Sequence, residues 1–364
     1  MRGGAENVLR ILAEMFPEAP IYTLLYDEKK LSDWFPKNRV RVSPVPQYPS
    51  ALRFNHHLYL SRFPSAVESW DFSAFDVVLS TSSAFVHGII TNGKPKHICY
   101  VHSPARYLWD RTHDVLDRAG QGVFGFIRKA YLARLFHRLR IWDSEAADRP
   151  DVLLAASKEV QRRIELYWRR ESEVIYPPVD DVWFQSRAKI NDQMQHPDYF
   201  LIVSTLARYK RIDLAIEICN KRSLHLKIIG EGPDRKRLER LAGPTIEFYG
   251  YRQNDELADL YTSAKAVLFP GEEDFGLVPL EAMACGTPVI AFGKGGARET
   301  ILDGVTGLFF EEATAQSLGS ALDRFQTSSF SPEACRTRAK EFSRTRFEEA
   351  IRRIIESVHP PLAD

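Results

Sequence analysis

The second half of the chain alternates between two patterns of apolar residues. Short runs that are almost entirely apolar predict buried parallel strands at 199–204, 224–229, 245–249, 266–270, 288–292 and 307–310. Segments with apolar residues three or four positions apart predict helices between them, at 211–220, 233–242, 255–264, 276–285 and 314–326. Repeated strand–helix units of this kind predict an α/β fold with a doubly wound parallel sheet.

The first half repeats this alternation less regularly. Strands are predicted at 21–26, 39–42, 76–80, 96–101 and 151–155, and helical patterns at 53–69, 122–140 and 157–168. Segment 174–180 contains Pro177 and Pro178, and paired prolines continue neither a helix nor a central strand. We therefore predict two domains, 1–178 and 179–342, with an amphipathic C-terminal helix at 343–358 that packs back on the first domain.

Composition narrows the class of protein. The chain has 364 residues, 44% of them apolar and 27% charged, which is typical of a soluble globular protein with ample core. A formal net charge of +1 provides no global attraction for nucleic acid, so we expect no nucleic-acid partner. The four scattered cysteines favour a reduced, cytoplasmic setting. We expect neither a transmembrane helix nor a signal peptide, because the sequence has no apolar run of suitable length.

Two glycines, Gly3 and Gly4, stand at the start of a predicted amphipathic helix. A glycine pair at a helix N-terminus lets the backbone approach a phosphate closely. Such loops normally follow a strand, and no strand pattern precedes these residues. We expect the first strand of the N-terminal sheet to be missing; the alternative is a flexible segment before an ordinary helix.

Two carboxylates are the most distinctive candidates for chemistry. Glu273 falls in a loop after a predicted strand, and Glu281 falls in the helix that follows. Carboxylates at such positions suit the vicinal hydroxyls of a sugar or ribose, and the backbone amides of Phe275, Gly276 and Leu277 suit an anion or hydroxyl at the helix start. The alternative is an ordinary strand–loop–helix unit with solvated acids.

A histidine follows the predicted strand 96–101. The carboxyl ends of strands line the ligand crevice of open α/β sheets. For His102, a role in a ligand-binding site and a purely structural role are therefore equally well supported. No GxGxxG opens the first helix of the second half, and no GxxxxGK[ST] occurs. These absences argue against a Rossmann domain that binds NAD and against a P-loop nucleotidase.

Segment 122–140 is basic, aromatic and helical in pattern. It combines seven apolar or aromatic residues with five basic ones: Phe124, Phe126, Ile127, Tyr131, Leu132, Leu135 and Phe136, and Arg128, Lys129, Arg134, Arg138 and Arg140. Two interpretations stand side by side. The segment rests on an anionic membrane surface, or it is an amphipathic helix that packs on its own domain.

Taken together, five stretches resemble the retaining glycosyltransferases of family 4, in particular the bacterial mannosyltransferase-like sub-group of O-antigen and exopolysaccharide assembly. They are Gly3–Glu6, Tyr100–Asp110, Ile175–Asp180, Leu206–Arg211 and Glu273–Ala291. The resemblance implies the GT-B fold, in which two Rossmann-like domains face a central cleft. It further implies that the N-terminal domain binds the acceptor and the C-terminal domain binds the nucleotide sugar.

The resemblance also implies a role for each candidate residue. A catalytic set stabilises the leaving diphosphate and contacts the sugar: His102, Glu273, Lys210 and Arg208. A donor-binding set holds phosphate, sugar, ribose and base: Gly3, Gly4, Phe275, Gly276, Leu277, Glu281, Tyr251 and Arg252. Retention in the family is explained by same-face attack, so no carboxylate nucleophile is needed. We expect no cofactor and no metal, because no Asp-x-Asp motif is placed to bridge a diphosphate.

One departure concerns the phosphate loop. Many family members carry an arginine five residues before the lysine, where this chain has Thr205, and we expect Arg208 to supply that charge. The implied activity is retaining hexosyl transfer, most closely mannose from GDP-mannose, to a lipid-linked or growing surface polysaccharide such as lipopolysaccharide. Alternatives are a UDP-glucose, UDP-N-acetylglucosamine or rhamnose donor, and a nucleotide- or glycan-binding protein without catalysis. The implied location is cytoplasmic, peripheral on the inner face of the plasma membrane.

Overall fold

The computed structural model describes residues 3–43, 59–185 and 199–359. The chain forms two compact units: unit 1 comprises Met1–Ile175 and Glu348–Asp364, and unit 2 comprises Tyr176–Phe347. The predicted boundary, between residues 178 and 179, lies three residues from the observed one. None of the helices within the described ranges is long and apolar enough to cross a membrane.

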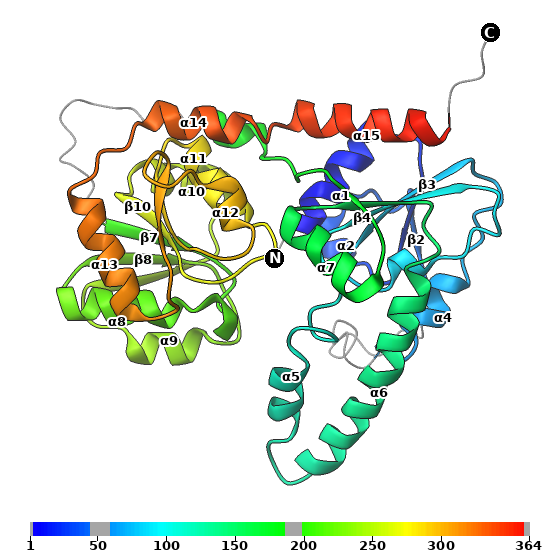
Figure 1. The fold of residues 1–364 in the computed structure, drawn as a ribbon, viewed down its shortest axis with the longest axis horizontal. Coiled ribbons are helices and arrows are strands. Elements are labelled where there is room, and N and C mark those ends of the chain that lie inside the picture. Colours follow the sequence, from blue (N-terminus) through cyan, green and yellow to red (C-terminus); the bar gives the residue numbers. More distant parts are fainter. Residues whose placement is uncertain (1–2, 44–58, 186–198, 360–364) are drawn as a thin grey trace. The chain divides into compact units, whose positions relative to one another are not determined.

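Unit 2 is built on one parallel sheet of six strands (Figure 1). The strands are β7 (Tyr199–Val203), β8 (His225–Ile229), β9 (Ile246–Gly250), β10 (Ala266–Phe269), β11 (Val289–Phe292) and β12 (Gly307–Phe310). They lie in the order β12-β11-β10-β7-β8-β9, and β7 pairs with β10 through Leu201 and Val267. This order is that of a doubly wound sheet, whose direction of winding reverses between β7 and β10.

Helices cover both faces of this sheet. They are η3 (Asp181–Phe184), η4 (Arg208–Lys210), α8 (Ile212–Arg222), α9 (Arg235–Leu241), α10 (Asn254–Thr262), α11 (Leu277–Ala284), α12 (Ala297–Thr300), α13 (Ala315–Gln326) and α14 (Pro332–Lys340). Successive residues of β7 point to opposite faces: Leu201 packs with α10, α11 and α14, whereas Phe200 and Ile202 pack with α8 and α13. Strands buried on both faces explain the continuous apolar runs in the sequence.

Unit 1 is also parallel, but its sheet lies in two parts among the described residues. The strands β1 (Ile21–Thr23) and β2 (Val40–Val42) form one part. The other part runs β3 (Val77–Ser82), β4 (Lys96–Val101), β5 (Val152–Ala155) and β6 (Glu173–Val174). The described residues contain no strand ahead of the first helix, and no pairing joins β1 to β3 within them.

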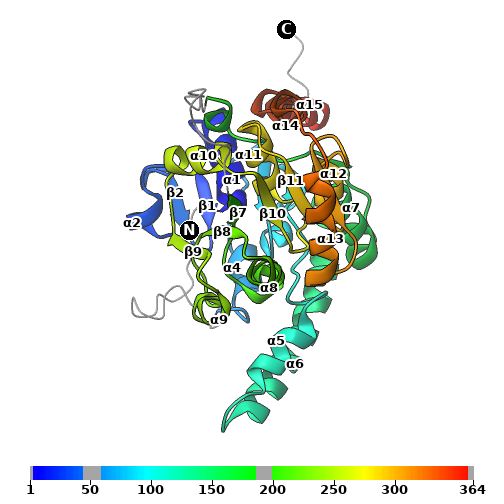
Figure 2. The same ribbon diagram turned by 90° about the vertical axis from the view of Figure 1, so that its left-hand side faces the viewer.

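The helices of unit 1 include three that were not predicted. In chain order the helices are α1 (Gly4–Met15), α2 (Glu28–Leu31), α4 (Phe63–Glu68), η2 (Val86–Gly88), α5 (Thr112–Ala119), α6 (Gly125–Ala146) and α7 (Lys158–Trp168). The three that were not predicted are α2, η2 and α5. Of the predicted helix 53–69, the first part lies outside the described residues. Figures 1 and 2 both show α5 beside the first half of α6, and this hairpin extends away from the sheets of unit 1. The last helix, α15 (Arg344–Val358), begins in unit 2 and continues in unit 1.

Candidate functional site

Lys210 and Glu273, two of the site candidates of unit 2, follow the strands between which the sheet reverses its winding. The segment after β7 leads into η4, which ends at Lys210, and the loop after β10 carries Glu273. In open α/β sheets, ligands bind outside the carboxyl ends of the strands at this switch point. The sheet topology therefore brings together two residues that are 63 positions apart in the sequence.

Lys210 and Glu273 form a direct ion pair, with 13% and 22% of their side chains exposed. The Lys210 ammonium also lies 5.1 Å from the centre of the Tyr209 ring. Gly271 makes this approach possible, because a Cβ atom there would lie 2.8 Å from the Cα atom of Lys210. The pair puts a cation and an anion in mutual contact at the carboxyl edge of the sheet.

A glycine pair fixes the loop that carries Glu273. The N–H of Gly296 donates to the carbonyl oxygen of Glu273 at 2.9 Å. Gly295 has a φ of +64°, and a Cβ atom there would lie 2.3 Å from the same oxygen. Only glycine allows the loop before α12 to press so closely on the backbone of Glu273.

The start of α11 presents unused backbone donors. The Phe275 ring is buried and stacks on Tyr176 at 5.6 Å, and Gly276 adopts a φ of +83° just before Leu277 begins the helix. Within the described ranges, the N–H groups of Phe275 and Gly276 make no hydrogen bond. Free N–H groups at a helix start favour an oxygen ligand.

Glu281 lies in α11 and faces the interior of unit 2. Its Oε2 atom accepts a hydrogen bond from the fully buried Tyr261 hydroxyl at 2.9 Å. Burial raises the pKa of Glu281 from 4.5 to about 7, against the opposing effect of the Tyr261 hydrogen bond, with Asp180 and Glu273 adding to the rise. The carboxylate is thus poised to gain or lose its proton near neutral pH.

Among the described residues, no ion pair joins the remaining unit 2 candidates to Lys210 or Glu273. Arg208 is exposed at the start of η4 and makes no ion pair with any described residue. Tyr251 and Arg252 directly follow β9, which is the edge strand of the sheet and lies two strands from β7. Arg252 pairs with Glu256 at 3.2 Å. Their predicted roles at the phosphate and the base stay predictions.

In unit 1, His102 follows β4, and its backbone N–H donates to the Ser82 carbonyl oxygen at 2.8 Å. Its Nε2 atom is buried and finds no partner among the described residues. Burial lowers the pKa of His102 to about 4, so the ring is neutral at physiological pH. An unpaired buried ring nitrogen costs free energy unless a ligand hydroxyl meets it.

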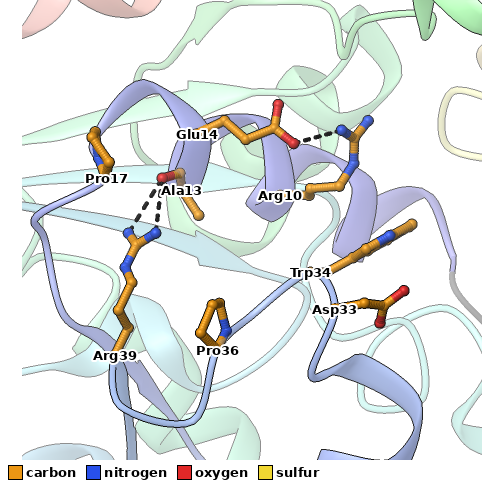
Figure 3. A pocket seen from close by; sticks show the side chains of 8 residues that line it. All are labelled: Arg10, Ala13, Glu14, Pro17, Asp33, Trp34, Pro36 and Arg39. Atoms are coloured by element: carbon orange, nitrogen blue, oxygen red, sulfur yellow. Dashed lines mark hydrogen bonds and ion pairs between the residues drawn. The ribbon is translucent and has the colours of Figure 1, made fainter.

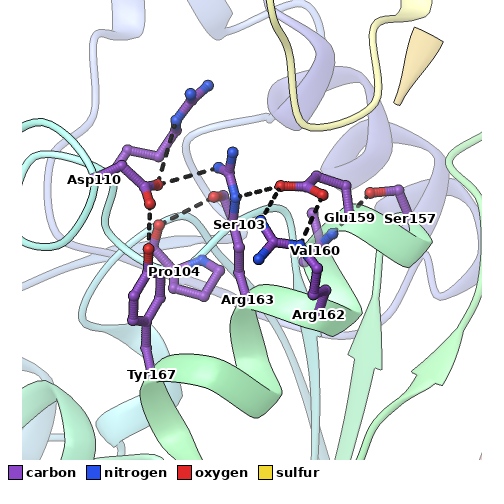
Figure 4. Close-up of polar contacts among 10 residues, drawn as sticks. Ser103, Pro104, Asp110, Ser157, Glu159, Val160, Arg162, Arg163 and Tyr167 are labelled. Carbon is purple, nitrogen blue, oxygen red and sulfur yellow. Dashed lines mark hydrogen bonds and ion pairs between the residues drawn. The ribbon is translucent and has the colours of Figure 1, made fainter. Parts of the chain in front are cut away.

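The segment after His102 is anchored by two buried groups. Arg163 of α7, 3% exposed, pairs with Asp110 at 3.3 Å and with Glu159 at 3.0 Å (Figure 4). Trp109 donates its indole N–H to Asp143 of α6 at 2.9 Å. Sequence reasoning missed this support, because a single arginine or aspartate within a helix has no local signature.

That same Asp143 carboxylate is fully buried and serves a second indole. Trp168 donates to its Oδ2 atom at 2.7 Å, and the His87 ring lies 4.5 Å from the Trp168 ring centre. Burial lowers the pKa of His87 despite this carboxylate. The network ties α6 and α7 to the segment that carries His102.

The two N-terminal glycines are placed as predicted at the start of α1. Gly3 precedes the helix, and its N–H donates to the Glu6 carboxylate at 3.0 Å. Glu6 therefore occupies the position at the helix start that an anion would take. The predicted phosphate contact of Gly3 and Gly4 stays a prediction.

A pocket on unit 1 lies apart from these candidates (Figure 3). It is lined by Arg10, Ala13, Glu14, Pro17, Asp33, Trp34, Pro36 and Arg39. Arg10 pairs with Glu14 at 2.7 Å, and Arg39 donates to the Ala13 carbonyl at 3.2 Å. Both guanidinium groups are thus used within the fold. In the part of the chain that the structure describes, no group of three acidic, histidine or cysteine residues could hold a metal ion.

Two parallel α/β units, one of which joins a cation and carboxylates at its switch point, define a two-domain α/β protein of the GT-B class. Residues 2–183, half of the chain, match the family Glycosyltransferase Family 4, and residues 185–342 match Glycosyl transferases group 1. The chain belongs to glycosyltransferase family 4. The predicted family and fold class are confirmed.

The curated relatives match over part of their length. An uncharacterized glycosyltransferase of Methanocaldococcus jannaschii is 27% identical over 178 residues, 48% of this chain and 49% of that protein. A GDP-mannose-dependent alpha-mannosyltransferase of Mycobacterium tuberculosis is 41% identical over 107 residues, 29% of this chain and 28% of that protein. A D-inositol 3-phosphate glycosyltransferase of Frankia alni is 34% identical over 179 residues, 42% and 44% of the two chains. The chain thus spans about half or less of the curated relatives it matches.

Solved structures are similar along almost the whole chain. The Anabaena protein HepE, in complex with UDP-glucose, has a TM-score of 0.68 at 18% identity, covering 98% of this chain and 97% of that one. Sucrose-phosphate synthase of Thermosynechococcus elongatus has a TM-score of 0.69 at 18% identity, covering 97% and 92%. At these identities the likeness shows the fold.

Proposed function

We propose that this protein transfers a hexose from a nucleotide-sugar donor to an acceptor with retention of anomeric configuration. The observation that carries the proposal is the Lys210–Glu273 pair at the switch point of unit 2. Departure of a nucleoside diphosphate develops negative charge, which a fixed cation stabilises. A carboxylate beside that cation suits the hydroxyls of the attached sugar.

Each group of unit 2 then has a distinct task. The diphosphate replaces Glu273 as the partner of Lys210, and the released carboxylate accepts hydrogen bonds from the donor sugar. The free N–H groups of Phe275 and Gly276 hold an oxygen of the same donor. Glu281 in its ionised form accepts hydrogen bonds from the ribose hydroxyls. Arg208 adds a second cation at the diphosphate.

For His102 we propose contact with the donor sugar. Its buried, unpaired Nε2 atom and its neutral state suit a hydrogen bond with a hydroxyl rather than with a phosphate. The network of Asp110, Arg163 and Glu159 holds the backbone that positions this ring. No carboxylate is assigned as a nucleophile, and we propose that the leaving phosphate takes the proton of the acceptor.

The donor we propose first is GDP-mannose. The support is the 41% identity, over 107 residues, to a GDP-mannose-dependent alpha-mannosyltransferase. The alternative is a UDP-linked sugar, supported by the fold shared with HepE bound to UDP-glucose. As acceptor we propose a lipid-linked or growing surface polysaccharide, with residues 122–140 in peripheral contact with an anionic membrane at the cytoplasmic face.

The test is turnover of radiolabelled nucleotide sugars, each incubated with the purified chain and a membrane extract. We expect transfer from GDP-mannose, and expect Lys210→Ala and Arg208→Ala each to lower kcat/KM by about a hundredfold, the effect of losing a charge-stabilising donor of about 3 kcal/mol. Lys221→Ala, an exposed cation on α8, is the matched control.

Three outcomes would contradict the proposal or one of its assignments. Tight nucleotide binding without transfer to any acceptor would favour a binding protein. Full turnover in Arg208→Ala would remove that residue from the site, and full turnover in Lys210→Ala would refute the assignment of the ion pair.

A further inference from the structure

The α5–α6 hairpin of unit 1 ends in a cluster of exposed apolar side chains. Here we call these residues the hairpin tip; their exposed fractions are Val123 95%, Phe124 76%, Phe126 83%, Ile127 66% and Tyr131 60%. Farther along α6, Phe136 and Leu139 are buried in the unit 1 core. The second half of α6 therefore packs into the core of unit 1, whereas its first half packs on α5 and leaves the tip side chains exposed.

The basic residues divide into two groups. Arg128 donates to the carbonyl oxygens of Ala119 and Gln121, both at 2.7 Å, and Lys129 pairs with Asp117 at 2.8 Å. These two cations link α6 to the end of α5 and the turn after it, and their predicted membrane contact stays a prediction. A charge reversal at either position would remove these contacts as well as any lipid contact, so Arg128 and Lys129 are left unchanged in the test below.

Three further cations are exposed, whereas Arg140 is half-buried and donates to the Leu108 carbonyl oxygen at 3.0 Å. Arg118, Arg134 and Arg138 make no ion pair with a described residue, and the sequence has no aspartate or glutamate between residues 118 and 142. Arg134 lies two turns from Phe126, about 12 Å along the helix axis. Apolar groups at the end and cations behind them match the order of acyl chains and anionic headgroups in a bilayer.

We propose that the hairpin tip inserts into the surface of an anionic bilayer, with Arg134, Arg138 and Arg118 among the headgroups. The tip is the end of a projection (Figures 1 and 2), so it enters a soft surface more readily than it covers a flat protein interface. Insertion to the acyl boundary buries the apolar side chains, and the cations select anionic lipids. This inference rests on the membrane contact proposed above for residues 122–140 and names the side chains that make it, and vesicle binding tests it without any sugar transfer.

The first experiment measures co-sedimentation of the full chain with vesicles of phosphatidylcholine alone or mixed with phosphatidylglycerol. We expect binding to the anionic vesicles, part of which persists at high ionic strength because apolar insertion is not screened. Phe124→Gln and Phe126→Gln should each lower the partition coefficient by about tenfold or more. Arg134→Glu with Arg138→Glu should remove the preference for anionic vesicles. Ile141→Gln and Arg352→Glu are matched controls, exposed but away from the tip.

A second experiment reports insertion directly. All four native cysteines are buried, so Val123→Cys can be labelled selectively with an environment-sensitive fluorophore. Insertion predicts a blue-shifted emission with anionic vesicles and quenching by spin labels on the acyl chains, whereas a label at Ile141→Cys stays in water. Unchanged emission at position 123 would overturn the proposal. So would concentration-dependent dimerisation that Phe126→Gln abolishes without any vesicle binding, since the tip would then contact a second copy.

Discussion

The replacement Glu281→Gln tests two effects of the buried carboxylate separately: its effect on the free energy of unfolding and its effect on nucleotide binding. Burial raises the pKa of Glu281 to about 7, and Tyr261 donates a hydrogen bond to it. Glutamine has nearly the same shape and keeps an oxygen for Tyr261, but it carries no charge. We expect the variant to be more stable than the wild type at alkaline pH and to bind nucleotide less tightly.

The direction in which stability changes with pH depends on whether the folded or the unfolded chain holds the Glu281 proton. Between pH 4.5 and about 7, the folded chain keeps the Glu281 proton and the unfolded chain releases it, so the wild-type free energy of unfolding falls as pH rises. This interval is worth about 3 kcal/mol, at 1.36 kcal/mol per pH unit. The stability difference between variant and wild type should be smallest below pH 4.5 and should level off above pH 7.

The assay must report on unit 2 alone, because two compact units need not unfold together. Denaturant-dependent hydrogen exchange, read by mass spectrometry on peptides from β10 and α11, gives the free energy of opening of this unit. The measurement is repeated from pH 4 to pH 8.5 for the wild type, Glu281→Gln and the exposed control Glu312→Gln. Calorimetric titration with GDP and UDP measures the nucleotide affinity of the same three proteins.

A stability difference that stays constant across this pH range would refute the reasoning, since Glu281 would then titrate alike in the folded and unfolded chains. Unchanged nucleotide affinity at pH 8 would separately remove Glu281 from the ribose. For the wild type, affinity should fall as pH drops below about 7, because the carboxylate gains a proton there.

Two further predictions follow from contacts in each unit. Glu273→Gln frees Lys210, so calorimetry should find nucleoside diphosphate binding tighter by about fivefold, the equivalent of a partly exposed ion pair of about 1 kcal/mol. Transfer should nevertheless slow, and weaker nucleotide binding would contradict the proposed exchange of partners. Asp143→Ala leaves one buried and one half-buried indole N–H group unpaired and should lower the stability of unit 1 by about 3 kcal/mol, read by hydrogen exchange on peptides of that unit. Asp143→Asn keeps an acceptor and is the control; equal losses in both variants would show that the hydrogen bonds matter little.

The elements of unit 2 were predictable because its strands are buried on both faces. Each predicted strand and helix in this unit agrees with the structure to within two residues at either end. The placement of Lys210 and Glu273 at one sheet edge also follows from parallel strands, whose carboxyl ends share an edge. Their direct contact does not follow, since it depends on strand order and on the close approach at Gly271.

Other features had no local signal. Short helices such as α5 and α14 are rich in charge, and their packing partners lie far away in sequence. The buried arginine Arg163 looks like any surface residue of a helix until Asp110 is placed against it. Apolar periodicity in α6 cannot distinguish side chains that enter the core from those that are left exposed, and the structure divides that helix between the two.

Helix α15 has a consequence for how the chain is made. Unit 2 is one continuous segment, whereas unit 1 consists of two segments, the second of which begins at Glu348. In this second segment Ile351 and Ile354 are buried, and Arg353 pairs with Glu173. At 5–20 residues per second, a ribosome needs on the order of 10–30 s to make a segment as long as unit 2. During that time unit 1 lacks its last helix, although its other elements were synthesised first. Unit 2 is therefore the first to have its whole sequence available for folding, and the nascent unit 1 is where we expect chaperones to bind.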